Sequence, residues 1–307
     1  MTAASAPGKL MLFGEYAVLE GHRSLALCFD RRIACSAAEH DGVRLDAPGV
    51  FEPPVELPLD ALAGEPPEGL RLIWPLLVDH GRGVSLTFDA AFPPTWGLGS
   101  SSASTLAAAG ALAALRGDEP DELALFAQVL DAQRSLQGAA SGYDAATQLL
   151  GGAVAYRAEP RELTRLPDRP FQWVVAYTGV KASTGAMIRS VREDHPVGSP
   201  IYAEIGALAE RGIAAWEADD AAALGTLMNQ GQALLERLGA APVELIAILR
   251  ALQADPAVLG ARLAGAGGGD CILILADDAD EAAAAARAHG LEILPLSPEP
   301  AGLRSLS

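Results

Sequence analysis

Hydrophobic residues recur along the chain in two patterns that predict strands and helices in mixed order. Short runs rich in β-branched and aromatic residues are typical of strands. Apolar residues at helical spacing predict helices, the longest an alanine-rich helix that follows the serines of "GLGSSSAS". No steady strand-helix-strand repeat emerges, so we expect an α+β fold rather than a doubly wound sheet. The predicted strands cover residues 10–19, 24–36, 83–92, 151–157, 169–179, 271–276 and 291–296, and further helices cover 121–136, 145–150, 201–218, 221–238, 242–252 and 279–289.

The length of 307 residues suits one large or two moderate domains. A segment rich in proline and arginine, "RAEPRELTRLPDRP", interrupts the regular patterns near the middle of the chain. We therefore predict an N-terminal domain at 1–157 and a C-terminal domain at 158–307.

Composition narrows the classes of function. No stretch approaches the roughly 18 apolar residues of a membrane span, and the N-terminus does not resemble a secretory leader, so we expect a cytoplasmic protein without a membrane partner. Cys28, Cys35 and Cys271 have no CxxC spacing, which argues against a disulfide framework or a zinc site. The net charge of -17 makes nucleic acid an improbable partner. Oligomeric state is left open between monomer and homodimer.

The strongest chemical signal is "GLGSSSAS" at residues 97–104, directly before the alanine-rich helix. Free N–H groups at a helix N-terminus, small side chains and serine hydroxyls together form a cradle for an anion such as phosphate. A single serine capping an ordinary helix is the alternative interpretation. The segment is not a Walker A loop, because no GxxxxGK[ST] occurs in the chain.

Three other features are candidates for a site. Lys9 follows a Pro-Gly turn at the start of a predicted strand, and it is one of two lysines in the chain, with Lys181. Asp144 opens a helix in "SGYDAATQLLGG", where it could be a simple cap, orient a lysine, bind Mg²⁺ or accept a proton. The glycine loop "GAGGGDC" at 265–271 is either a tight turn between two elements or a segment whose backbone a ligand approaches closely.

Together these motifs resemble the superfamily of galactokinase, homoserine kinase, mevalonate kinase and phosphomevalonate kinase (GHMP kinases) over nearly the whole chain. "APGKLMLFGEYAVLEG" is similar to its first motif, "PPTWGLGSSSAS" to its phosphate-binding motif and "GAGGGDC" to its third. The resemblance implies a two-domain fold, with an N-terminal domain like ribosomal protein S5 domain 2 and a ferredoxin-like C-terminal domain. It also implies ATP and Mg²⁺ as cofactors.

Within the superfamily the chain most resembles phosphomevalonate kinase, through Tyr16 in the first motif, Asp270 in the third and the segment "YTGVKASTGAMIRSV". That resemblance implies transfer of phosphate from ATP to 5-phosphomevalonate, giving 5-diphosphomevalonate in isoprenoid synthesis. Mevalonate kinase is the alternative, although Gln133 stands where mevalonate kinases carry a metal-binding glutamate. A metabolite-binding protein of the same fold without catalysis is a remote alternative.

The resemblance also assigns roles to residues. Lys9 would bridge the transferred phosphoryl group and the acceptor, and Asp144 would hold Lys9 and act on the acceptor or the metal. The remaining assignments are ATP binding by Gly97, Leu98, Gly99, Ser100, Ser101 and Ser102, metal binding by Ser101, and substrate binding by Lys9, Tyr16, Ser141, Gly142, Ser183, Thr184, Ala266 and Gly267. Because an acidic acceptor needs cations, Arg31, Arg32 and Arg189 are candidates for binding it.

Overall fold

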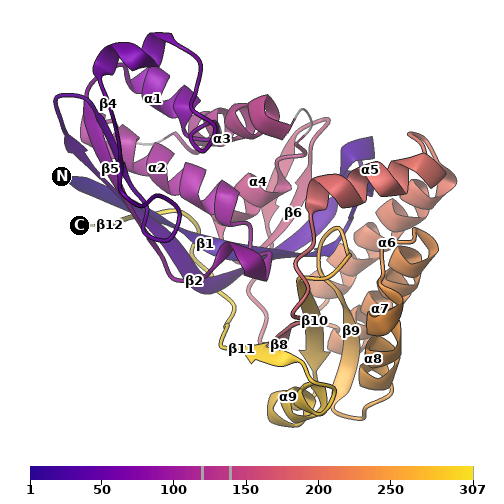
Figure 1. Cartoon of the computed structure of the whole chain (residues 1–307). Helices are drawn as coiled ribbons and strands as arrows, with labels where there is room; N and C mark the ends of the chain where they lie inside the picture. Colours follow the sequence, from indigo (N-terminus) through magenta and orange to yellow (C-terminus); the bar gives the residue numbers. More distant parts are fainter. Residues whose placement is uncertain (119–120, 138–139, 307) are drawn as a thin grey trace.

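The computed structural model describes residues 1–118, 121–137 and 140–306, and it contains two sheets with helices packed around them (Figure 1). The first sheet has the order β12-β1-β2-β5-β3-β4, with a β6–β7 pair attached to β2. Its strands pair antiparallel except for β3 and β5, which are parallel. The strands are β1 (Thr2–Phe13), β2 (Ser24–Glu39), β3 (Val43–Asp46), β4 (Val55–Leu57), β5 (Val84–Ala90), β6 (Ala153–Arg157), β7 (Glu162–Arg165) and β12 (Arg304–Leu306).

The second sheet is antiparallel, with the order β11-β8-β10-β9. Its strands are β8 (Gln172–Tyr177), β9 (Val258–Leu263), β10 (Cys271–Ala276) and β11 (Glu292–Leu294). The unbroken apolar run of β10 is explained by two cores. Leu273 and Leu275 point into the large core shared with the first sheet, whereas Ile272 and Ile274 point into a second core beneath the C-terminal helices. The second sheet therefore joins the two halves of the molecule.

Helix α2 (Ser100–Arg116) is the central helix of the first half, and it lies across β1 and β2. Six of its seven alanines are almost completely buried, and Gly110 lies so close to the sheet that a Cβ there would be 3.0 Å from the Cβ of Ala4. Small side chains let the helix approach the sheet closely, which fixes its N-terminus relative to β1. The other helices are α1 (Trp74–His80), α3 (Glu122–Gln137), α4 (Tyr143–Leu150), α5 (Thr184–Asp194), α6 (Pro200–Glu217), α7 (Ala221–Arg237), α8 (Val243–Gln253) and α9 (Ala279–Ala288), with short 3-10 helices η1 (Ala17–Glu20), η2 (Leu59–Ala63) and η3 (Pro94–Trp96).

The expected α+β class is confirmed, but the first predicted strand is wrong at both ends. The strand begins at Thr2, because Pro7 and Gly8 form an irregularity inside β1 rather than a turn before it. It ends at Phe13, because Gly14 and Tyr16 take positive φ angles of 98° and 61° that lead into η1. Lys9 therefore lies in the middle of a long strand.

Several elements were not predicted, and one of them lies in the presumed boundary segment. Strand β7 follows residue 157 and pairs with β6, and β12 at the C-terminus pairs with β1, so the first sheet draws on both halves of the chain. The division of the chain at residue 157 stays a prediction. Within the described residues no helix is both long and apolar enough to cross a bilayer. The unpredicted strands and α-helices are β3, β4, α1, β7, α5, β9 and β12, and the three 3-10 helices were not predicted either.

Candidate functional site

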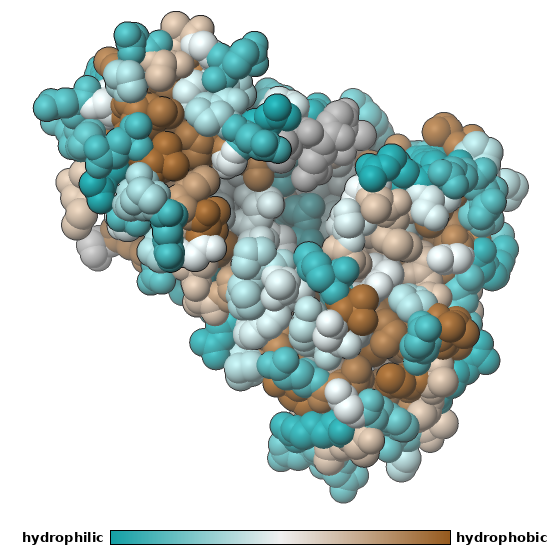
Figure 2. Space-filling view, in the orientation of Figure 1, coloured by the Kyte–Doolittle hydropathy of each residue, from teal (hydrophilic) through white to brown (hydrophobic). Residues whose placement is uncertain are grey.

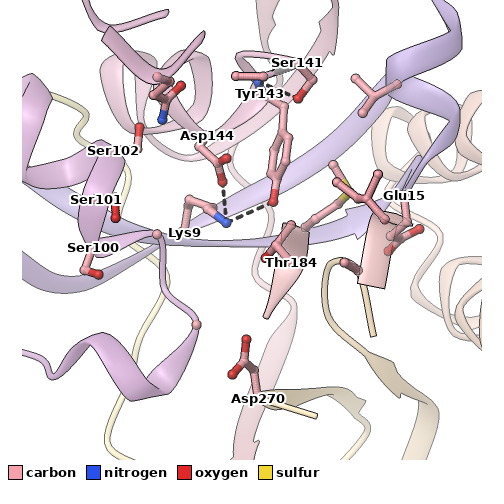
Figure 3. A pocket seen from close by; sticks show the side chains of 18 of the residues that line it. Lys9, Glu15, Ser100, Ser101, Ser102, Ser141, Tyr143, Asp144, Thr184 and Asp270 are labelled. Atoms are coloured by element: carbon pink, nitrogen blue, oxygen red, sulfur yellow. Dashed lines mark hydrogen bonds and ion pairs between the residues drawn. The ribbon is translucent and has the colours of Figure 1, made fainter. Parts of the chain in front are cut away.

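A cavity of about 230 Å³ lies where the two halves of the molecule face each other. Figure 2 shows the surface hollowed between the two halves, and Figure 3 shows the side chains that converge in the cavity. One wall comes from β1, the loop before α2 and the start of α4. The opposite wall comes from the start of α5 and the glycine loop before β10. Five segments that are distant in sequence therefore form one site.

The loop before α2 is shaped by two glycines that could not be replaced without strain. Gly97 and Gly99 have φ angles of 72° and 73°. A Cβ on Gly99 would lie 2.5 Å from Cε of Lys9, and a Cβ on Gly97 would lie 2.6 Å from Oδ2 of Asp270. The side chains of Lys9 and Asp270 thus pack directly on the backbone of this loop, each beside one glycine.

The N-terminus of α2 opens into the cavity without a side-chain cap. Gly99 takes the cap position, and its carbonyl accepts hydrogen bonds from Ala103 N–H at 3.0 Å and from Gln148 Nε2 at 3.1 Å. The hydroxyl of Ser102 is buried and has no hydrogen-bond partner among the described residues. Unpaired helix N–H groups and a spare hydroxyl at one point form a site suited to an anion.

Lys9 is the central cation of the cavity, and its side chain is almost fully buried. Its Nζ forms an ion pair with Oδ1 of Asp144 and donates a hydrogen bond of 2.9 Å to Oη of Tyr143 (Figure 3). Tyr143 and Asp144 are the first two residues of α4. The backbone N–H of Lys9 also donates a hydrogen bond of 2.9 Å to the carbonyl of Leu98, which links β1 to the loop before α2. The ammonium group is therefore held at a fixed point beside the N-terminus of α2.

The charge state of this cluster follows from its neighbours. Burial alone would lower the pKa of Lys9, but the charge of Asp144 and the contacts with Tyr143 outweigh burial and raise the pKa above its ordinary value. The pKa of Tyr143 is also raised, by burial first and then by the charge of Asp144. At neutral pH the cluster holds a charged ammonium and a neutral phenol.

The opposite wall carries a second pair of oppositely charged side chains. Nζ of Lys181 lies 3.3 Å from Oδ1 of Asp270, and both residues line the cavity. Tyr16 joins the walls, because its hydroxyl donates a hydrogen bond of 2.5 Å to the carbonyl of Ala266 in the glycine loop. Its pKa is raised by burial and by the charge of Glu15, so this phenol stays protonated.

Glu15 also lines the cavity, and its charge is neutralised by a buried arginine of the other half. Nη2 of Arg262 donates to Oε1 of Glu15 at 2.6 Å, and Nη1 of Arg262 donates to the carbonyl of Leu12 at 2.6 Å. Both side chains of the ion pair are at most 3% exposed. Breaking such a pair leaves an uncompensated buried charge, which is strongly destabilising. The pair therefore fixes how β9 meets the end of β1.

A larger and more apolar cavity of about 690 Å³ lies on the other side of the N-terminus of α2. Phe51, Ile73, Phe88 and Phe92 contribute to its lining. The two cavities share Pro94, Ser100 and Ser101, so they meet at the first turn of α2. An extended ligand with an apolar end, an anionic middle and a polar end would fit this arrangement.

Most residues that the sequence selected come together in the smaller cavity, and their roles stay predictions. Leu98, Gly142, Ser183 and Gly267 do not line it. Leu98 is buried, and Ser183 accepts a hydrogen bond from the N–H of Ala186 as the N-cap of α5. A Cβ added to Gly142 would clash with Tyr156 and Phe126, and one added to Gly267 would clash with the carbonyl of Ala240. The residues selected from the sequence that do line it are Lys9, Tyr16, Gly97, Gly99, Ser100, Ser101, Ser102, Gln133, Ser141, Asp144, Thr184, Ala266 and Asp270.

Arg31 and Arg32, two candidates for binding the acceptor, do not line the cavity, and both point to the C-terminal segment. Arg32 pairs with Glu299 at 3.2 Å and donates to backbone carbonyls, and Arg31 donates to the carbonyl of Pro295. These contacts hold the returning chain against β1 and β2. Arg189 lies on α5 close to Gly185 and does not line the cavity either.

Sequence reasoning missed Tyr143, the position of Lys181 in the cavity and the apolar cavity. Tyr143 precedes Asp144 inside the quoted motif, but a residue next to a candidate is not a signal by itself. The scarcity of lysine was a usable signal for Lys181, since both lysines of the chain line the same cavity.

Comparison with protein families identifies two matching regions. Residues 70–152 match the model described as the N-terminal domain of GHMP kinases, and residues 212–291 match the model of their C-terminal domain. These two regions contain α2 and the N-terminus of α4 on one side, and the glycine loop on the other.

Known proteins are similar over nearly the whole chain. A mevalonate kinase of Thermococcus sibiricus is 30% identical over 301 residues, which cover 90% of this chain and 89% of the relative. The crystal structure of Methanococcus jannaschii mevalonate kinase has a TM-score of 0.81 at 20% identity and covers 99% of this chain and 98% of that one. Streptococcus pneumoniae phosphomevalonate kinase, solved with phosphomevalonate and AMPPNP, also has a TM-score of 0.81 at 20% identity and covers 97% of this chain and all of that one.

Proposed function

The chain belongs to the GHMP kinase family, and we propose that it transfers the γ-phosphoryl group of ATP to the primary hydroxyl of mevalonate. The observation that carries this proposal is the convergence of Lys9 and Asp144 with the uncapped N-terminus of α2 in one cavity. Phosphoryl transfer depends mainly on positioning and on neutralising charge, and these groups suit both tasks.

We propose mevalonate as the acceptor, rather than the phosphomevalonate that the sequence favoured, for two reasons. The Thermococcus sibiricus relative, which is 30% identical to this chain, is a mevalonate kinase. The charge of the cavity gives an independent reason. Among the described residues that line it, the cations are Lys9 and Lys181, and each already has a carboxylate partner in Asp144 or Asp270.

Phosphomevalonate would bring a carboxylate and a phosphate of charge about −1.5 to −2 beside the triphosphate of ATP. Two lining lysines among the described residues are few for so many negative charges, because an unpaired charge in a partly buried site is costly. Mevalonate brings a single carboxylate. Phosphomevalonate remains the second candidate, and the experiment below offers both acceptors.

The two adjoining cavities support a specific orientation of ATP. The apolar cavity suits the base and sugar, and the phosphates would cross the first turn of α2 to reach Lys9. The free N–H groups of that turn and the hydroxyls of Ser101 and Ser102 would hold phosphate oxygens. The γ-phosphorus then faces the acceptor in the smaller cavity.

Asp144 and Lys9 have different roles in the proposed transfer. The hydroxyl oxygen of mevalonate attacks the γ-phosphorus, its proton passes to the carboxylate of Asp144, and the bond to the β–γ bridging oxygen breaks so that ADP leaves with the electron pair. Lys9 neutralises charge on the transferred group, and its raised pKa keeps it protonated. Tyr143 accepts a hydrogen bond from Lys9 and limits the movement of the ammonium group.

Mg²⁺ suits the residues that line the phosphate end of the cavity. Its preferred ligands are oxygens, and it is usually held by one or two carboxylates together with phosphate oxygens. Asp144, Ser101 and the unpartnered hydroxyl of Ser102 provide such oxygens. Gln133 offers an amide oxygen but no charge, so Asp144 would be the main protein ligand. The bound ion would neutralise phosphate charge during transfer.

The test is ADP release from Mg·ATP by the purified protein, with mevalonate or 5-phosphomevalonate offered in parallel and Lys9→Met as the control variant. We expect a kcat/KM for mevalonate that exceeds the value for phosphomevalonate by about 100-fold or more, an energy of about 3 kcal/mol. A preference for phosphomevalonate would reverse the choice of acceptor. ATP binding without acceptor-dependent turnover would instead indicate a metabolite-binding protein.

A further inference from the structure

The second lysine of the chain is held in a way that differs from the first. The Lys181 side chain is 48% exposed, whereas its partner Asp270 is 16% exposed. Lys181 lies between β8 and α5, on the wall that faces the loop before α2. One end of this ion pair is therefore fixed, and the other end is a long side chain in contact with solvent.

Asp270 is held in place by hydrogen bonds and by a packing contact. Its backbone takes a φ of 54°, its N–H donates to the carbonyl of Val180 at 2.7 Å, and its Oδ1 accepts the N–H of Ala182 at 3.1 Å. Its carboxylate also packs against Gly97, at the start of the loop that leads into α2. Asp270 thus holds the segment of Lys181 next to the place where an anion would lie.

The pair is suited to exchange of partners. An ion pair with so much exposure contributes little to folding, so its loss in favour of another anion costs little. A phosphate group offers more negative charge than one carboxylate and forms stronger charge-assisted hydrogen bonds. The N-terminus of α5 begins three residues after Lys181, and its dipole further favours an anion there.

We propose that Lys181 is a second phosphate-binding residue, which leaves Asp270 and pairs with the β- and γ-phosphates of the nucleotide from across the cavity. Asp270 is a positioning residue that keeps Lys181 at the mouth of the cavity until the nucleotide binds. This inference rests on the proposed use of ATP. It adds to that proposal a contact from the second half of the molecule to the nucleotide.

Calorimetric titration of ATP, ADP and AMP into the wild type and three variants tests the inference. Lys181→Met keeps the length of the side chain and removes its charge. Asp270→Asn keeps an oxygen that can accept the N–H of Ala182 and also removes the charge. Arg237→Met is the matched control, because it breaks an exposed ion pair with Glu204 outside the cavity. Thermal unfolding of each variant checks that it is folded.

We expect Lys181→Met to weaken the binding of ATP and ADP about tenfold and to leave AMP almost unchanged, because AMP lacks the β- and γ-phosphates. Asp270→Asn should act in the opposite direction and strengthen ATP binding by about threefold, because Lys181 no longer has a competing partner. The control should bind all three nucleotides as the wild type does.

Equal ATP affinity in the wild type and Lys181→Met would overturn the inference alone. A similar loss of affinity in Lys181→Met and Asp270→Asn would also overturn it, because that result identifies the pair as a structural contact. A wild type that binds no ATP would overturn the proposed function, and this inference with it.

Discussion

Replacement of Gly99 by alanine tests whether the backbone at the loop before α2 sets the position of Lys9. An alanine Cβ at this position would lie 2.5 Å from Cε of Lys9, whereas carbon atoms in ordinary contact are about 3.5–4.0 Å apart. Lys9 must therefore move by about 1 Å or more, against its contacts with Asp144 and Tyr143. A misplacement of about 1 Å in a phosphoryl-transfer site lowers the rate about 100-fold.

Gly117→Ala is the matched control, because Gly117 ends the same helix with a φ of 80° and a Cβ there meets no described atom within 4 Å. Both variants force alanine into the left-handed region, at a cost of about 1–2 kcal/mol in the free energy of unfolding. Gly99→Ala adds about 1–3 kcal/mol for overpacking. The assays are urea unfolding and ADP release at saturating ATP and mevalonate. If the two variants had equal stability and equal kcat, the reasoning would be refuted.

Three further predictions concern the cluster around Lys9. Asp144→Asn should lower kcat about 100-fold or more in the ADP assay, because it removes the proton acceptor and the charged ligand proposed for Mg²⁺; an unchanged kcat would rule out the role as proton acceptor. Tyr143→Phe keeps the ring and loses one hydrogen bond to Lys9, so kcat should fall about three- to tenfold in the same ADP assay, and a wild-type rate would show that the bond is dispensable. The pKa of Lys9 is raised in the folded state, so the stability from its ion pair is fully present below the unfolded value of about 10.4 and is lost only as pH rises through the folded pKa. The difference in unfolding free energy between the wild type and Lys9→Met should therefore be constant from about pH 6 to about pH 9, and a decline within that range, measured by urea unfolding, would contradict the assigned charge state.

The sequence predicted the parts of the fold in which local pattern and burial agree. The alanine-rich helix and the apolar run of β10 are examples, since both are buried along most of their length. Helix α5 was missed because only Val191 is buried among its described residues, so its apolar residues give weak periodicity. Strand β9 was missed because Arg262 interrupts its apolar pattern. That arginine is buried only because Glu15, 247 residues earlier, neutralises it.

The candidate site was predicted through its motifs, and its internal contacts were not. Lys9, Ser101 and Asp144 were selected from separate segments, and the structure brings them to one cavity. The contact of Tyr143 with Lys9 depends on how α4 is oriented on the sheet, and no local pattern encodes that orientation. The position of Arg31 and Arg32 outside the cavity was not predicted, because an arginine that binds a ligand and an arginine that holds a returning chain have the same sequence signal.

The measurement that tests the central claim most directly is ³¹P NMR of the product formed from Mg·ATP by the wild type, with mevalonate and with 5-phosphomevalonate in separate samples. The account predicts a new phosphomonoester resonance and stoichiometric ADP with mevalonate, and no such product from Lys9→Met. A diphosphate product from phosphomevalonate, without reaction of mevalonate, would contradict the proposed acceptor. ADP formation without any phosphorylated acceptor would contradict phosphoryl transfer itself.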